Sequence, residues 1–246
     1  MTKKYNVISF LIVMTIWWIG SKVFPPLVVP SIGMVGDSMI KILSSPKLRF
    51  QILLTLERLL LALLIGNAVG FIIGYFSGIN ETFRKLIKPI ISILQVTPPV
   101  AILIIAIMWF GFNGKPAIAI AFLAILPTII ISVQEGILNI DHKLIQMGKT
   151  FKLSKESIFK NIIIPSIAPH ITSGWKISLG TACKTVVMGE VLTTTTGIGG
   201  NISEARLNLE PEGVIAWTII TIILFYLIDL LVKMLLRKGG EMDADN

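Results

Sequence analysis

Three charged residues interrupt one long apolar stretch of the chain, at positions 176, 184 and 190. Ionisable side chains inside an apolar span are costly in a bilayer, so they are candidates for function. Lys176 and Lys184 are eight residues apart, which on a helix is about 12 Å along the axis and about 80° around it. Two cations on one side of a helix suit an anion, and Glu190 could neutralise a lysine or gate a pathway. The alternative is structural: ion pairs, or side chains that reach the bilayer surface.

The sequence contains few residues that could act in catalysis. The histidines are His142 and His170, and the single cysteine, Cys183, excludes an intrachain disulfide and a cysteine metal site. Neither HExxH, GxSxG nor a Cys–His pairing is present. The run Gly111–Pro116 contains a lysine, but it has neither the spacing nor the hydroxyl residue of a nucleotide-binding P-loop. We therefore predict no catalytic residue, no bound metal and no cofactor in this chain.

The composition is that of a membrane protein. Of 246 residues, 54% are hydrophobic and only 15% are charged, whereas a soluble domain carries about 25% charged residues. Apolar stretches of about 20 residues, the length that crosses a bilayer, recur along the chain. We predict an all-α membrane protein with one domain over residues 1–246. Its six transmembrane helices are expected near residues 5–24, 52–76, 88–110, 116–136, 166–192 and 213–235.

The basic residues predict how these spans are oriented. If both termini lie in the cytoplasm, the cytoplasmic segments carry about twice as many lysines and arginines as the outer segments, as the positive-inside rule requires. The net charge of +8 then reflects topology, and we predict no nucleic-acid partner. The expected location is the inner or plasma membrane, with the segment 141–165 in the cytoplasm.

That cytoplasmic segment has the pattern of two short amphipathic helices joined by a turn. Asp141 can cap the first helix, whose apolar positions recur at helical spacing at Leu144, Met147, Gly148 and Phe151. Ser154 can cap the second helix, which has an apolar face at Ile158, Phe159, Ile162 and Ile163. Pro165 opens the next span. A hairpin of this kind either serves as a docking element or lies on the bilayer surface.

Three segments, taken in order, resemble one family. Ile164-Pro165 closes the hairpin where binding-protein-dependent ABC importer permeases have Leu-Pro after an E-A-A and glycine pattern. Thr97-Pro98-Pro99 with Trp109-Phe110-Gly111 is similar to the P-P…W-F-G segment of the sulfonate, taurine and nitrate branch. Gly189-Glu190 with Gly197-Ile198-Gly199 is similar to the A-E…G-L-G segment. The resemblance covers about residues 28–235, and it implies a fold like that of a type I ABC importer.

The resemblance also implies which residues contact an ATPase. These are Gln146, Met147 and Gly148 at the E-A-A positions, Lys152 at the glycine position, Ser154 at the turn, Phe159 at the aromatic position, and Pro165. Two positions depart from the pattern, because the acidic residue is missing and lysine replaces glycine. If position 152 adopts the left-handed conformation, lysine there costs on the order of 1 kcal/mol.

The partners that the resemblance implies are a pair of ABC ATPase subunits holding Mg-ATP, a second permease copy, and an extracytoplasmic substrate-binding protein. The expected function is inward transport of a small solute by alternating access. The solute would be an anion such as a sulfonate, taurine or nitrate, or a small vitamin precursor. An ion-coupled secondary transporter without an ATPase is the alternative, but it leaves the lysine-rich hairpin without a role. An intramembrane enzyme ranks third.

Four glycines at a spacing of four residues mark the second predicted span: Gly66, Gly70, Gly74 and Gly78. On a helix they form one nearly straight groove, and small residues let two helix backbones approach in a membrane. The groove predicts close helix packing, either within the chain or between two copies.

Overall fold

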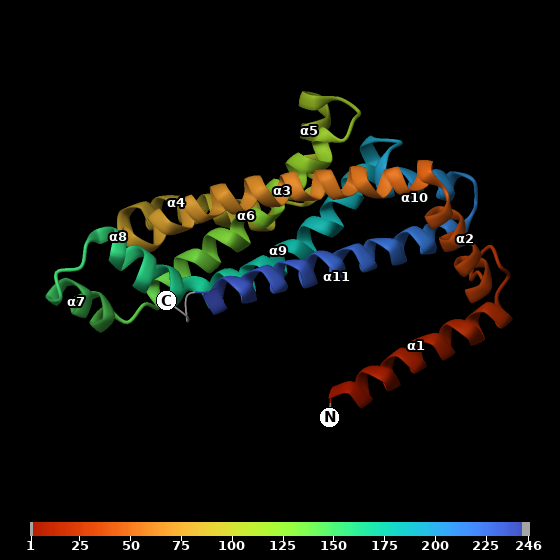
Figure 1. Cartoon of the computed structure of the whole chain (residues 1–246). Helices are drawn as coiled ribbons and strands as arrows, with labels where there is room; N and C mark the ends of the chain where they lie inside the picture. The colour runs from red at the N-terminus through yellow and green to blue at the C-terminus, as the bar shows by residue number, and fades with distance from the viewer. Residues whose placement is uncertain (1, 243–246) are drawn as a thin grey trace. The chain divides into compact units, whose positions relative to one another are not determined.

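The computed structural model describes residues 2–242, and every regular element in that range is helical, which confirms the predicted all-α class. The elements are α1 (Thr2–Val23), α2 (Ile32–Ser44), α3 (Pro46–Ile79), α4 (Glu81–Val96), α5 (Pro99–Phe110), α6 (Lys115–Leu138), α7 (His142–Thr150), α8 (Lys155–Ile158), a π-helical turn (Phe159–Ile163), α9 (Ile164–Thr193), α10 (Gly197–Leu207) and α11 (Pro211–Met242), as Figure 1 shows.

The chain contacts group into two compact units. One consists of the described residues up to 56 together with those from 190 onward, and the other is Glu57–Gly189. In the first unit, α2, α10 and α11 share an apolar core that includes Val35, Ile198 and Trp217. In the second unit, α4 packs on α6 through Ile91, Leu126 and Ile130.

Three helical segments within the described residues are long and apolar enough to cross a membrane: Pro46–Ile79, Lys115–Leu138 and Pro211–Val232. The pair α4 and α5 makes at most a fourth, and the apolar segment Val7–Val23 of α1 is shorter. The α9 helix does not reach this standard, because polar residues interrupt it. The structure thus contains helices over all six predicted ranges without confirming the count of six spans.

The predicted third span, residues 88–110, is not one straight helix. It is divided between α4 and α5, whose axes differ by 95°. Proline disfavours helical geometry in the residue before it, and Thr97 is accordingly extended, with ψ 122°. Pro98 follows with ψ 130°, so two consecutive prolines (Pro98 and Pro99) end one helix and begin the next. Pro89, inside α4, leaves that helix continuous.

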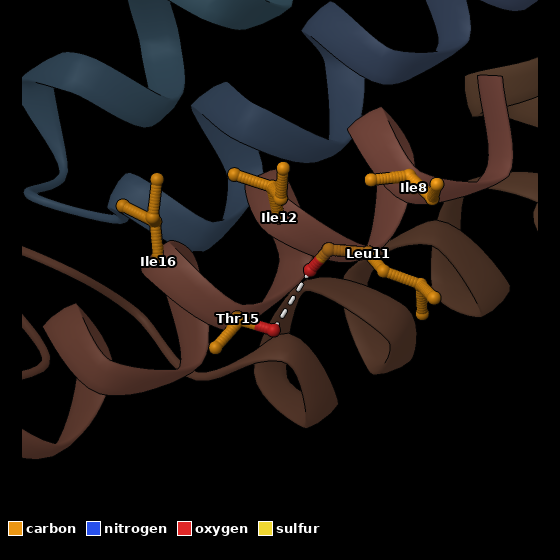
Figure 2. A pocket seen from close by; sticks show the side chains of 5 residues that line it. All are labelled: Ile8, Leu11, Ile12, Thr15 and Ile16. Atoms are coloured by element: carbon orange, nitrogen blue, oxygen red, sulfur yellow. Dashed lines mark hydrogen bonds between the residues drawn. The ribbon is translucent and has the colours of Figure 1, made fainter. Parts of the chain in front are cut away.

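The α1 helix presents an apolar surface suited to lipid. Figure 2 shows a shallow hollow lined by Ile8, Leu11, Ile12, Thr15 and Ile16, all from this one helix. Its one polar side chain, Thr15, donates its hydroxyl hydrogen to the carbonyl of Leu11 at 2.8 Å. Because the polar group is satisfied inside the helix, this face needs no water.

The glycine groove of α3 faces α6 in the same chain. A Cβ atom built at each glycine would collide with α6: at Gly70 it would lie 2.7 Å from Ile129 Cγ2, and at Gly74 2.8 Å from the backbone oxygen of Ile130. Gly66 and Gly78 meet Ile125 and Ile137 in the same way. The structure therefore places the four glycines at an intrachain helix contact.

Candidate functional site

Both helices of the segment 141–165 begin at the predicted caps. The Asp141 carboxylate accepts a hydrogen bond from the Lys143 amide at 2.8 Å, and the Ser154 hydroxyl accepts one from the Ser157 amide at 3.1 Å. The second helix is a single turn that passes through the π-helical turn directly into α9. Pro165 lacks an amide hydrogen and its ring crowds the carbonyl four residues earlier, which accounts for the local widening.

The end of α7 is closed by Lys152 in the left-handed conformation, with φ +55°. The Lys152 amide donates to the carbonyl of Lys149 and the Leu153 amide to the carbonyl of Gly148, both at 3.0 Å. These two bonds form a Schellman motif, in which glycine is the usual residue at the left-handed position. The chain therefore keeps the turn that a glycine would make and accepts the strain of a side chain there.

Two of the predicted docking residues, Gly148 and Phe159, pack against other parts of the chain. Gly148 is buried, and a Cβ atom there would lie 3.0 Å from Ile162 Cδ1 and 3.2 Å from Ile158 Cγ1. The Phe159 ring is half-buried and meets the ring of Tyr75 edge-on, with centroids 5.6 Å apart and an interplanar angle of 82°. Gly148 thus joins the two helices, and Phe159 attaches them to α3.

Three large apolar side chains of α7 and its C-terminal end are exposed, on the stripe that also contains the buried Gly148. Leu144, Met147 and Phe151 are 41%, 55% and 72% exposed, and their spacing puts them on one side of the helix. Other exposed side chains on the hairpin are Gln146, Lys152, Ser154 and Pro165. Leu144 and Phe151 were not predicted as site residues, although their helical spacing in the sequence was a usable signal. The hairpin is visible in Figure 1 at the labels α7 and α8.

The two lysines of α9 are both exposed in the single chain. Ser173 and Ile177 on the same helix are exposed as well, so the open side of α9 mixes polar and apolar groups. Inside, the Ser178 hydroxyl has no hydrogen-bond partner among the described residues. Lys176 and Lys184 therefore both lie on a surface of α9 that the other helices of the same unit, Glu57–Gly189, do not cover.

Glu190, by contrast, is fully buried. Its carboxylate accepts hydrogen bonds from the Thr55 hydroxyl, at 2.8 Å to Oε2, and from the Gly199 amide at 2.9 Å. The Thr55 oxygen in turn accepts the Ile198 amide at 2.7 Å. Gly197, with φ +85°, lies so close that a Cβ atom there would overlap the carboxylate. The acid therefore caps the positive N-terminal end of α10, which is a positioning role.

The fold is that of an all-α membrane protein, because the described residues include helices long and apolar enough to cross a bilayer. Residues 66–238 match the family model of the binding-protein-dependent transport system inner membrane component. The chain belongs to this family. It is therefore a multi-pass membrane protein and an ABC importer permease, as the sequence resemblance predicted.

Individual relatives agree with this assignment. The chain is 26% identical to the taurine transport system permease protein TauC of Escherichia coli K12, over 94% of this chain and 86% of that one. It is 30% identical to the nitrate import permease protein NrtB of Synechococcus elongatus, over 81% of this chain and 71% of that one. An inward-facing structure of the MetNI methionine ABC transporter matches with a TM-score of 0.63 at 16% identity, over 79% of this chain and 98% of that one. The permease therefore falls in the sulfonate, taurine and nitrate branch and has a type I importer fold.

Proposed function

We propose that this chain moves a small anion inward, powered by a separate pair of ATPase subunits that dock on the α7–α8 hairpin. The observation that carries the proposal is the open apolar face of α7, formed by Leu144, Met147 and Phe151. An amphipathic helix with anchors at this spacing fits a hydrophobic groove on a partner protein. Mg-ATP would be held by the partner, since this sequence contains no phosphate-binding loop.

The attachment of the hairpin explains how docking could move the spans. Phe159 packs on Tyr75 of α3, and the π-helical turn continues without interruption into α9. A displacement of the hairpin is therefore transmitted to two helices at once through packed contacts. This arrangement supports alternating access driven by closure of the ATPase pair.

The lysines of α9 support a dimer around an aqueous pathway. Lys176 and Lys184 are exposed in the single chain, and charged side chains in a span face a protein interior or water in preference to lipid. A second copy placed against this surface would enclose both lysines. Two cations would attract a sulfonate, taurine or nitrate, which are the solutes in the names of the relatives. Transport of a small vitamin precursor would need no such charge.

The orientation that we propose puts both termini and the hairpin in the cytoplasm, with a substrate-binding protein on the other side. The basic residues that favour this orientation include Lys143, Lys149 and Lys152, all exposed on the hairpin. The side chains of Lys3, Lys4, Lys233, Arg237 and Lys238, which contribute to the same count, lie outside the described residues.

The docking proposal is tested by Phe151→Asp. Phe151 is 72% exposed, so the substitution should leave the permease folded while it places a charge in the apolar groove. We expect co-purification of a candidate ATPase to fall by about tenfold or more, since a buried unpaired charge costs several kcal/mol. The matched control is Phe112→Asp, at a phenylalanine that is 79% exposed outside the hairpin. Equal ATPase binding by the two variants would refute the docking assignment.

The pathway proposal is tested by Lys184→Gln, with Lys184→Arg as the control that keeps the charge. In reconstituted vesicles with ATPase and binding protein, uptake of an anionic solute should fall in the glutamine variant and persist in the arginine variant. If a Lys176→Gln, Lys184→Gln double variant took up the solute as fast as the wild-type chain, neither lysine would be part of the transport pathway. Uptake by the permease without nucleotide would instead support the ion-coupled alternative.

A further inference from the structure

A second polar site lies between α4 and the end of α6, and its lining includes neither hairpin residues nor the α9 lysines. It is a cavity of about 540 Å³, within the range of about 300–1,000 Å³ that is typical of small-molecule pockets. Its charged lining consists of Arg84, Lys85 and Lys88 against the single acid Glu81. Glu81 is bound to Lys85 at 2.8 Å, so Arg84 and Lys88 supply the excess positive charge.

The donors of this cavity are held in place by one buried residue, Ser77. Its hydroxyl donates to the side-chain oxygen of Gln134, which leaves the two amide hydrogens of Gln134 as donors. Its backbone carbonyl accepts Arg84 Nη1 at 3.3 Å, and a guanidinium has further N–H groups to offer. Ser77 is 0% exposed. The cationic fork and the amide are thus pre-positioned, which distinguishes the cavity from a patch of mobile surface lysines.

The α4 helix separates polar from apolar groups by its two faces. Arg84, Lys88, Ser92 and Gln95 line the cavity at a spacing that keeps them on one side of the helix. Leu86, Ile90 and Ile93 lie off that stripe and are 67%, 52% and 62% exposed. The cavity wall also includes Ile91, Ile131 and Leu138. A ligand that fits would be anionic at one end and apolar at the other.

We propose that this cavity binds the phosphate headgroup of an anionic phospholipid, with the acyl chains along the exposed apolar side chains of α4. Arg84 would hold the phosphate oxygens with its planar fork, which suits phosphate geometry, while Lys88 and Gln134 complete the contacts. Basic pockets between helices at the cytoplasmic side of a membrane favour such headgroups. That this end is cytoplasmic rests on the orientation proposed above.

The test is native mass spectrometry of the full chain in detergent with phosphatidylglycerol or phosphatidylcholine. Both headgroups contain a phosphate, but phosphatidylcholine also carries a quaternary ammonium, which Arg84 and Lys88 would repel. We therefore expect phosphatidylglycerol to be retained at least about tenfold more tightly. Arg84→Gln with Lys88→Gln should remove this preference. The control variant, Lys47→Gln with Lys115→Gln, removes the same amount of charge at two exposed lysines outside the cavity. This variant should retain the preference for phosphatidylglycerol.

A second variant tests the same cavity without removing the hydrogen bond of Arg84, so that a loss of binding cannot be attributed to misfolding. Among the described residues, the Ser92 hydroxyl bonds its own helix, at the Lys88 carbonyl. The substitution Ser92→Glu therefore adds a negative charge to the cavity without breaking the Arg84 bond. It should also abolish the preference. Equal retention of both lipids by the wild-type chain, or retention of phosphatidylglycerol by Ser92→Glu, would overturn the proposal. If millimolar inorganic phosphate displaced the lipid, the ligand of the cavity would be a free anion and the lipid proposal would be wrong. None of these readouts depends on ATPase docking or transport, so they fail or succeed independently of the proposed function.

Discussion

Replacing Lys152 with glycine should stabilise the hairpin. Lys152 holds φ +55°, a conformation that costs a residue with a side chain about 1–2 kcal/mol. Glycine removes this strain but loses about 0.4–1 kcal/mol through the greater freedom of the unfolded chain. The net gain is about 1 kcal/mol, which corresponds to about fivefold in the local opening equilibrium. Hydrogen exchange should therefore slow by about fivefold at the Leu153 amide, which bonds the Gly148 carbonyl across the turn.

Lys152→Ala is the control for this experiment. Alanine removes the positive charge but keeps the Cβ atom that causes the strain. Exchange at the Leu153 amide should therefore remain close to that of the wild-type chain in Lys152→Ala. If alanine slowed exchange as much as glycine, the charge and not the backbone conformation would be responsible. If glycine had no effect, the left-handed turn would not be the strained element that we infer.

Thr55→Val should lower the free energy of unfolding by about 3 kcal/mol, because it deprives Glu190 of a donor and leaves a buried amide unpaired. Thr55→Ser keeps the hydroxyl and should lower the free energy of unfolding much less. Thermal unfolding can be measured by dye labelling of the single cysteine, Cys183, which is buried in the folded chain. Gly74→Val should cost about 1–3 kcal/mol, because its Cβ atom would meet a backbone oxygen of α6 that cannot rotate away. Gly36→Ala, with nothing within 4 Å of its Cβ atom, should be neutral or stabilising in the same assay.

The sequence predicts local features well where a few neighbouring residues decide them. Asp141 and Ser154 begin their helices as expected, because an N-cap bond reaches only two or three residues along the chain. The sequence left open whether position 152 keeps the left-handed turn of the family's glycine, and the structure shows that it does. The bend at Thr97 follows from the two prolines after it, but its angle of 95° could not be read from them.

What the sequence by itself determined is the membrane class, the apolar ranges, the hairpin caps and the family, since each depends on composition, local periodicity or motif spacing. Only the tertiary structure decided which partner each side chain meets. In the folded chain the glycine groove packs against α6, and Phe159 packs against Tyr75. Glu190 accepts a hydrogen bond from Thr55. The tertiary structure also joins Arg84 and Gln134 through Ser77. These contacts link residues far apart in the chain, and a helical pattern shows which residues share a face without showing what that face packs against.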